Sequence, residues 1–544
     1  MLLCVTFSVA SHDNGEAPHG GNPPLHAIDT MRAFKEDHHA PEPLSSVSAT
    51  TCISGFASGY PCSNIDLLAF MPLSEIGGGE GSDIWGWTDS ETGKEYAIMG
   101  RSNGTSFVDI SDPVNPVYLG DLPPHSSNSS WRDIKVYADH AYIVTEANNS
   151  GLQVFDLAML RTVTSPPQTF SETNWFGGFL SAHNIVINET TGFAYAVGTN
   201  NGDCNQGMYF IDIRDPANPA AAGCFAADGY THDAQCVLYE GPDSSYQGRE
   251  ICFNYNEDTL TIVDVTNKSA PVQLSRTDYV GRHYTHQGWL TDDHRYLLMD
   301  DELDERHVSA ITKTRTFIWD VADLNAPASM GFYEAPVGSI DHNQYIKGRY
   351  SYQANYQAGL RILDISDVAN ANLSEVAFFD IYPAGDATEF NGAWSNFPFF
   401  DSGTVIVSGI EQGLFILRPT IAPFSVNIDV DPWSVLNIIK PNTDDPITLV
   451  VLGSAGFNVL EIDSASLKLG PGEAPTTTSA PWLGYFDDNA TGHLDAAYGF
   501  NTQDTGIACY DTEVNLTGVT TGGDLFEATD SIDASDCATG VCHP

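Results

Sequence analysis

Short strand-like runs that end in aspartate recur through the middle of the chain. Phe107-Val-Asp-Ile-Ser-Asp-Pro and Phe210-Ile-Asp-Ile-Arg-Asp-Pro are the clearest copies, and β-branched or aromatic residues precede the Asp in each. Such runs, closed by Asp and Pro, predict strands followed by turns. The recurring aspartates cap these turns in our interpretation, and they are Asp109, Asp156, Asp212, Asp264, Asp320 and Asp364.

A second recurring position lies upstream of each Asp-terminated strand, within the same repeat unit. Its positions follow one another at steps of 49 to 56 residues, which defines seven units. Four short strands per repeat of about 50 residues predict an all-β fold, a seven-bladed β-propeller, because a parallel β-helix would need much shorter repeats. The marker residues are Asp83, Asp133, His183, His232, His286, His342 and Asn391.

The last unit lacks its outermost strand, because the pattern ends after Leu414–Leu417. Residues 64–73, before the first unit, have the character of that missing strand. We therefore expect residues 64–73 to complete the last blade, which would remove an exposed sheet edge.

The pattern divides the chain into four parts. Residues 1–20 form a signal-peptide-like segment, and residues 21–63 an extension that contains the Cys52/Cys62 pair. Residues 64–423 are the predicted propeller. Residues 424–544 alternate like a small C-terminal β-sandwich.

The repeats also carry a family resemblance. The Asp-terminated strands resemble the LVIVD repeat. The segments Asp83-Ile-Trp-Gly-Trp, Gly104-Thr-Ser-Phe-Val-Asp and Trp131-Arg-Asp-Ile-Lys-Val are similar to the choice-of-anchor B family of secreted surface proteins. The resemblance covers about residues 50–423 and implies a secreted β-propeller more than any particular activity.

Charge excludes several partners. The 544 residues contain 71 Asp and Glu against 22 Lys and Arg, for a net charge of −49. A nucleic-acid-binding protein needs a basic surface, and docking on anionic lipid is disfavoured for the same reason. No apolar run reaches the length of about 18 residues that a transmembrane helix requires. This acidity suits an extracellular, cation-rich medium.

Cysteine placement indicates an oxidising compartment. The ten cysteines include no CxxC pair, so a zinc ribbon is excluded, and most lie in local pairs. The segment Met1-Leu-Leu-Cys-Val-Thr-Phe-Ser-Val-Ala resembles a signal peptide without its basic start. Eight Asn-x-Ser/Thr sequons permit glycosylation. We predict a secreted or surface protein with disulfides formed by Cys52, Cys62, Cys204, Cys224, Cys236, Cys252, Cys509 and Cys537.

The histidine markers are the strongest candidate for chemistry. In a propeller the first strand of each blade lines the axis, so His183, His232, His286 and His342 would converge there, with Asp83 and Asp133 opposite. Imidazole and carboxylate ligands suit a divalent transition metal such as Zn, Cu, Fe or Mn. A hydrogen-bonded structural belt without metal is the alternative, because an Asn, Asp or Gln follows each His.

Loops beside this ring supply candidate catalytic residues. Glu146 and His283 are candidate general bases, and Arg101, Arg132 and Arg282 would orient an anionic group. The acidic run from Asp300 to Glu305 is interpreted as a solvated loop, with a metal or catalytic cluster as the alternative.

The C-terminal part contains a candidate calcium loop. Asp487, Asn489, Thr491 and Asp495 place oxygen donors at alternate positions around Gly492. An Asx-rich turn without calcium is the alternative.

Two functions remain open. One is a secreted or surface-associated metal-binding propeller, which acts as an enzyme on a polar extracellular small molecule. The other is a non-catalytic extracellular protein that binds glycans or partner proteins for adhesion or as a scaffold, with calcium stabilising the C-terminal module. The enzyme form draws on architectural analogy to propellers with axial His metal sites.

Overall fold

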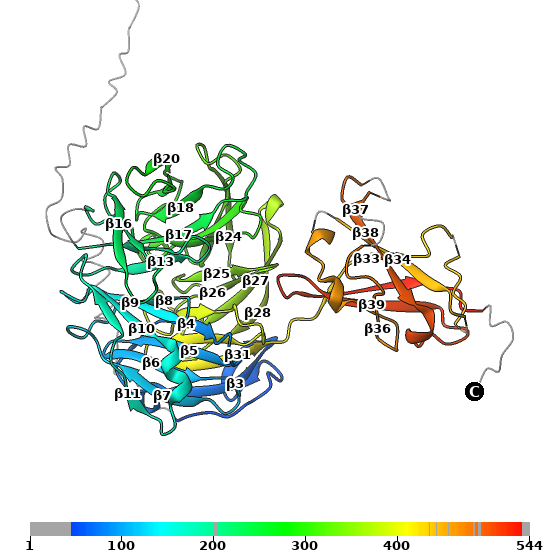
Figure 1. Cartoon of the computed structure of the whole chain (residues 1–544), viewed down its shortest axis with the longest axis horizontal. Coiled ribbons are helices and arrows are strands. Elements are labelled where there is room, and N and C mark those ends of the chain that lie inside the picture. The colour runs from blue at the N-terminus through cyan, green and yellow to red at the C-terminus, as the bar shows by residue number, and fades with distance from the viewer. Residues whose placement is uncertain are drawn as a thin grey trace, which may run out of the picture.

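The computed structural model describes residues 45–200, 204–434, 436–441, 443–454, 456–481, 485–487 and 491–535. The chain is all-β, as predicted, and forms a larger unit and a smaller C-terminal unit (Figure 1). The signal-peptide-like residues 1–20 lie outside the described residues. In the described part, no helix combines the length and apolarity needed to cross a membrane.

In the described part of the larger unit, the strands form seven sheets with an antiparallel four-stranded core. In most of these sheets the spatial order of the strands follows the chain, which is the arrangement of a β-propeller. The sheets are β4 (Gly81–Thr88), β5 (Glu95–Arg101), β6 (Gly104–Asp109), β7 (Val117–Leu122) and β11 (Gln168–Thr169); β8 (Arg132–Tyr137), β9 (His140–Thr145), β10 (Leu152–Asp156) and β12 (Asn174–Phe176); β13 (Asn184–Asn188), β14 (Phe193–Val197), β15 (Met208–Asp212) and β16 (Ala220–Phe225); β17 (Asp233–Leu238), β18 (Glu250–Tyr255), β19 (Leu260–Asp264) and β20 (Val272–Thr277); β21 (Thr285–Leu290), β22 (Tyr296–Asp301), β23 (Arg315–Asp320) and β24 (Ala328–Glu334); β25 (Gln344–Lys347), β26 (Tyr350–Ala354), β27 (Leu360–Asp367) and β28 (Asn372–Phe379), extended by β2 (Tyr60–Ser63) and β1 (Phe56–Ala57); and β29 (Ala393–Phe397), β30 (Val405–Gly409), β31 (Gly413–Pro419) and β3 (Ile65–Pro72).

Among the described residues, helices are few and short. They are η1 (Leu73–Glu75), η2 (Leu157–Thr162), α2 (Asp304–His307), η3 (Val368–Asn370), η4 (Val459–Glu461), η5 (Ser464–Ser466) and η6 (Thr502–Asp504).

The seventh sheet joins the two ends of the larger unit. Strand β3 pairs antiparallel with β31, and the register places Leu67 opposite Leu417 and Phe70 opposite Phe415. The Phe70 and Phe415 rings lie 4.5 Å apart, centroid to centroid, within a buried apolar cluster. Residues from before the first sheet therefore supply the fourth strand of the last one.

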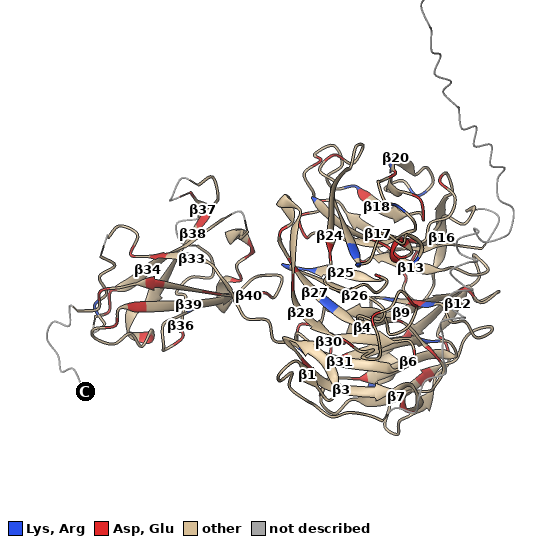
Figure 2. Cartoon of the chain, turned by 180° about the vertical axis from the view of Figure 1, so that it is seen from behind, with Lys and Arg blue, Asp and Glu red and all other residues tan. Residues whose placement is uncertain are grey.

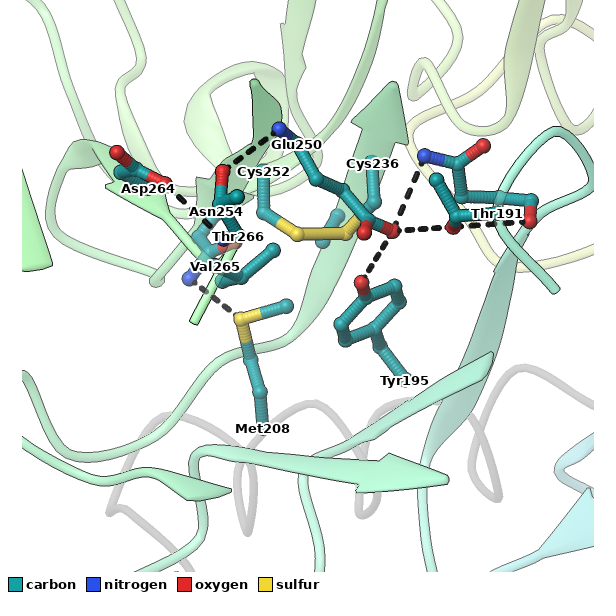
Figure 3. The surroundings of a disulfide bond; sticks show 12 residues. Thr191, Tyr195, Met208, Cys236, Glu250, Cys252, Asn254, Asp264, Val265 and Thr266 are labelled. Atoms are coloured by element: carbon teal, nitrogen blue, oxygen red, sulfur yellow. Dashed lines mark hydrogen bonds between the residues drawn. A yellow bond between two sulfur atoms is a disulfide. The ribbon is translucent and has the colours of Figure 1, made fainter. Parts of the chain in front are cut away.

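Buried polar bridges join neighbouring sheets besides the apolar contacts. Glu250 on β18 is 4% exposed, and its Oε1 accepts hydrogen bonds from Asn188 Nδ2 (3.0 Å), Thr191 Oγ1 (2.7 Å) and the hydroxyl of Tyr195 in the preceding sheet (Figure 3). Lys268 Nζ lies 2.6 Å from Glu250 Oε2. One carboxylate thus ties two sheets together with its charge compensated.

Disulfides form between the local cysteine pairs. The predicted Cys52–Cys62, Cys204–Cys224 and Cys236–Cys252 bonds are present, and Cys236 and Cys252 lie opposite each other on β17 and β18 (Figure 3). Cys509 is also disulfide-bonded, while Cys537 lies outside the described residues.

The smaller unit contains two sheets around one apolar core, which includes Val430, Leu449, Tyr498 and Leu516. Its strands are β32 (Phe424–Ser425), β33 (Asn427–Val430), β34 (Pro446–Leu452), β35 (Lys468–Leu469), β36 (Ala474–Pro475), β37 (Tyr485–Phe486), β38 (Asp495–Asn501), β39 (Glu513–Val519) and β40 (Leu525–Ser531). Acidic residues are spread over both units (Figure 2).

Like charges meet where the smaller unit contacts the larger one. The backbone N–H of Arg349 donates to Asp524 Oδ2 at 2.8 Å, and Asp292 of the larger unit lies in the same area. Burial and the charges of Asp524 and Asp293 raise the pKa of Asp292 to about 6. The ionised form of Asp292 therefore lowers the stability of the folded protein.

We expect Phe70→Ala to lower the free energy of unfolding of the larger unit by about 3–5 kcal/mol, because it empties the closing contact with Phe415. Urea denaturation followed by tryptophan fluorescence measures this loss. Val272→Ala, at a side chain that is 56% exposed, is the control, with an expected change within about 0.5 kcal/mol. An equally small effect of Phe70→Ala would contradict the role given to the closing strand.

We expect Asp292→Asn to stabilise the protein at pH 8, by at most about 1 kcal/mol because the site is partly exposed. The amide still accepts the hydrogen bond that Gly348 donates, but it has no charge to repel Asp524. Because the folded pKa is raised, the advantage should shrink as pH falls through about 6 and vanish below the unfolded value of about 4. Thermal unfolding across this pH range tests it, with Asp292→Glu as a charge-retaining control that should give no stabilisation.

Candidate metal centre

Four histidines lie side by side at the starts of successive innermost strands. His183 precedes β13, His232 precedes β17, His286 is in β21 and His342 lies just before β25. The ring centroids are 4.3 Å apart for His183 and His232, and 4.4 Å apart for each of the next two pairs. The predicted convergence of these four side chains is therefore what the structure shows.

Each imidazole uses its Nδ1 atom for a hydrogen bond within the protein. For His232 and His342 the partner is a backbone carbonyl, which can only accept, so Nδ1 of these two rings carries the proton. When such a ring is neutral, its Nε2 atom has a free lone pair. The same outward anchoring of Nδ1 is typical of metal-binding histidines. The partners are Glu146 Oε1 for His183 (2.7 Å), the His286 carbonyl for His232 (3.0 Å), Asp300 Oδ1 for His286 (2.9 Å) and the Trp394 carbonyl for His342 (2.5 Å).

Glu302 completes a group of three possible ligands. It follows β22, and its Oε2 lies 3.9 Å from His286 Nε2 while its Oε1 lies 3.7 Å from His342 Nε2. The three ligand atoms lie within 4.8 Å of one another, and all three residues are buried. The hydroxyl of Tyr356 donates to Glu302 Oε1 at 2.7 Å and fixes the carboxylate.

Burial sets the charge of this group. It is the main cause that lowers the pKa of His342 to about 3 and holds the pKa of His286 well below its usual range. Burial also raises the pKa of Glu302 to about 7. Near neutral pH both imidazoles are therefore uncharged, which is the form that binds metals.

Two imidazoles and one carboxylate are a donor set that holds Zn²⁺ or Fe²⁺ in proteins. Ligand bonds of about 2.0–2.2 Å place neighbouring donor atoms roughly 3.0–3.5 Å apart, so the three side chains would move closer together around a bound metal. Three protein ligands leave further coordination positions open. The residues present thus fit a transition metal of the catalytic kind.

The predicted ligand set is only partly assembled. His286 and His342 belong to the group of three, whereas His183 and His232 extend the row of rings beside it. Burial holds the pKa of His232 well below its usual range. For His183 burial also acts to lower the pKa, but the hydrogen bond and the charge of Glu146 outweigh it, so the pKa of His183 is raised.

Asp83 and Asp133 are engaged elsewhere. Lys135 Nζ lies 3.2 Å from Asp83 Oδ2 and 2.6 Å from Asp133 Oδ1, and the backbone N–H of Ile185 donates to Asp133 Oδ2. The proposed metal role of the two aspartates is corrected accordingly, because the ammonium of Lys135 occupies both carboxylates. Burial raises the pKa of Asp83 well above its usual range, despite Lys135.

The candidate catalytic residues are dispersed. Glu146 holds His183 and is therefore at the row of imidazoles, but the other four make contacts of their own. His283 stacks on His307 with ring centroids 4.8 Å apart; Arg101 donates to Ser106, Asn103 and the Gly78 carbonyl; Arg132 Nε donates to the Arg101 carbonyl; and Arg282 Nε donates to Asp278 Oδ1.

The acidic run from Asp300 to Glu305 is buried, so its interpretation as a solvated loop is wrong. Asp300 anchors His286, and Asp301 accepts the backbone N–H groups of His283 and Tyr284. Glu302 was missing from the predicted ligands. The signal that could have found it is this dense acidic run directly after the fifth repeat's second strand.

The C-terminal loop shows a turn geometry. Asp487 accepts backbone N–H groups of Thr491 and Gly492 at 2.9 Å each, and Asp495 Oδ1 accepts that of Gly453 at 2.8 Å. Asn489 lies outside the described residues. Calcium binding here stays a prediction.

Comparison with known proteins supports the repeats. The LVIVD repeat family matches residues 254–278 and 344–377, which confirms that prediction, whereas the resemblance to the choice-of-anchor B family stays a prediction. No curated protein matches the chain.

Several solved structures align with the chain at low identity. The Kuenenia stuttgartiensis hydrazine synthase has a TM-score of 0.42 at 11% identity, over 60% of this chain and 93% of that one. A protein from Lactobacillus plantarum has 0.40 at 13%, over 69% and 93%. The Cps50 (Swd1) β-propeller domain of Myceliophteria thermophila has 0.40 at 12%, over 63% and 97%.

We expect Lys135→Met to lower the free energy of unfolding by about 3–5 kcal/mol, because it leaves Asp83 and Asp133 buried without a counter-charge. Chemical denaturation at pH 7 measures the effect. Lys94→Met is the matched control: Lys94 pairs with Asp109 at 2.7 Å but is half exposed, so its loss should cost less than about 1 kcal/mol. Equal effects of the two variants would contradict the structural role of Lys135.

Proposed function

We propose that this LVIVD-repeat β-propeller protein is a secreted metalloprotein that holds a divalent transition metal through His286, His342 and Glu302. The observation that carries the proposal is the grouping of these three buried ligand atoms within 4.8 Å, with Nδ1 of both histidines already bound to protein acceptors. A purely structural belt would not need an additional buried carboxylate facing two Nε2 atoms.

The proposal includes catalysis on a polar extracellular substrate, because three protein ligands leave room for water or substrate. A metal bound there would lower the pKa of a bound water or polarise a substrate oxygen. The protein's own residues orient the ligands: Tyr356 holds Glu302, and Asp300 holds His286. Glu146 takes the Nδ1 side of His183, so His183 presents Nε2 to the same row.

The architecture that we infer is a closed seven-bladed propeller followed by a C-terminal β-sandwich. The seven sheets and the β3–β31 pairing of the described chain support the first part, and the two sheets around one core support the second. Calcium at Asp487, Thr491 and Asp495 belongs to the same proposal.

An extracellular location is supported by the disulfides and by the LVIVD repeats. In that setting the partner would be a small molecule, a glycan or another protein. Because the protein is strongly acidic, a negatively charged glycan or protein would be the least suitable partner.

Metal analysis of protein purified without an affinity tag tests the function. We expect a stoichiometric transition metal in the wild type, its loss in His286→Ala and His342→Ala, and an affinity about 10–100-fold weaker in Asp300→Asn, which replaces the carboxylate that orients His286 with a weaker acceptor. Circular dichroism should show that the fold persists in each variant.

Asp83→Asn is the control, because Asp83 is equally buried but faces Lys135. It should leave the metal content unchanged. A wild type that carries calcium alone or no metal would overturn the proposal and favour a non-catalytic binding protein, and metal loss in Asp83→Asn would contradict the assignment of ligands.

A further inference from the structure

The end of the innermost strands opposite the histidines contains a cavity of about 720 Å³. The last residues of β4, β8, β13 and β17 line it, together with residues that follow β29. None of the four histidines is among the described residues that line it, and neither is Glu302; along β17 the wall runs from Ala234, two positions after His232, to Leu238. The cavity is therefore a separate site from the metal centre, and its volume lies in the range of small-molecule sites.

Aromatic rings form one part of the cavity wall. Trp85 lies edge-on to Phe397, with centroids 5.0 Å apart and an interplanar angle of 67°, and Trp289 and Phe399 also line the space. Tyr345 packs behind them, edge-on to both tryptophans at 5.6 and 5.0 Å. Trp85 and Phe397 meet at a steep angle, whereas Trp289 and Phe399 are tilted by 36°, so the ring faces point in several directions and form no single flat stacking platform.

The charge in the cavity is negative. Asp139, Glu189 and Glu240 line it; Asp139 lies 3.7 Å from Arg161 Nη2, whereas Glu189 and Glu240 are exposed. Lys135 is the one Lys or Arg among the described lining residues. His294 adds no positive charge near neutral pH, because burial lowers its pKa.

Lys135 cannot offset the acidic wall. Its ammonium bonds Asp83 Oδ2, Asp133 Oδ1 and the Ile134 carbonyl, so its three N–H donors are all used, and two carboxylates already balance its charge. Lys135 also shows that an ammonium group can lie against an aromatic ring of this wall, since its Nζ lies 4.6 Å from the centre of the Trp85 ring. An ammonium group against an aromatic face is thus already part of the site.

We propose that this cavity binds a small organic cation, a substituted ammonium with an apolar body, against Trp85 and Trp289 with Glu189 as the counter-charge. Attraction to aromatic faces favours a desolvated ammonium, and the acidic rim attracts cations and repels anions. A neutral saccharide would need a flat stacking platform, which the steep angle between Trp85 and Phe397 disfavours.

Choline is the probe, because 3,3-dimethyl-1-butanol has nearly the same shape without the charge. Calorimetry and tryptophan fluorescence should show that choline binds roughly 3- to 30-fold more tightly than the alcohol, the range that cation–π attraction provides. Cellotetraose is titrated in parallel. Binding of cellotetraose alone, equal binding of the two isosteres, or no choline binding up to about 10 mM would each overturn the proposal.

Substitutions locate the bound cation. Trp289→Leu and Glu189→Gln should each weaken choline binding at least about threefold, and added salt should reduce the contribution of Glu189. Trp433→Leu and Glu513→Gln are matched controls on exposed residues of the smaller unit and should leave the affinity unchanged.

His286→Ala should also keep choline binding, because the metal centre lies at the other end of the strands. Loss of choline binding in that variant, or unchanged affinity in both Trp289→Leu and Glu189→Gln, would contradict the site. Because Glu189 is at the surface, its substitution does not endanger folding, which keeps the test informative.

Discussion

The antiparallel pairing of β3 with β31 is the interaction on which the larger unit depends. It covers the ladder edge of the last sheet with a strand from the start of the chain, and it buries Leu67 and Phe70 in the process. Once the sheets are arranged in a ring, equivalent residues of their innermost strands face a common axis. Imidazoles that are 49 to 56 residues apart in the sequence then lie 4.3–4.4 Å apart. The candidate metal centre is therefore a property of the ring and of no single segment.

Several buried carboxylates away from the centre are compensated by lysine. Glu250 has Lys268, and Asp83 and Asp133 share Lys135. The carboxylate of Glu302 lies instead against a tyrosine hydroxyl and two neutral imidazoles, and the charges of His183 and Arg306 lower its pKa without outweighing its burial. A buried carboxylate in such surroundings costs free energy unless a cation or a proton joins it. A divalent metal would remove that cost and use the two Nε2 lone pairs at once.

Repetition made the strands and the axial histidines predictable, since a period near 50 residues fixes which positions are equivalent. The ligand set was less predictable. Equivalent positions of the repeats have equivalent Cα positions in the fold, but this does not determine which side chains contact one another. Asp83 and Asp133 occupy marker positions, yet both form ion pairs with Lys135, which lies two residues after Asp133. Glu302 comes from a loop outside the repeat pattern, and in sequence a buried acidic loop has the same composition as a solvated one. The cavity at the far end of the strands also depends on packing angles that no sequence pattern contains.

The Cys236–Cys252 disulfide has a consequence for how the ring can open. It joins directly opposite residues of β17 and β18, and Glu250 next to it holds the preceding sheet. A covalent cross-strand link restricts separation of these strands, while closure of a loop of this size limits the unfolded chain. The sheet that follows His232 is therefore held against fraying both by a covalent link within it and by the Glu250 bridge to its neighbour.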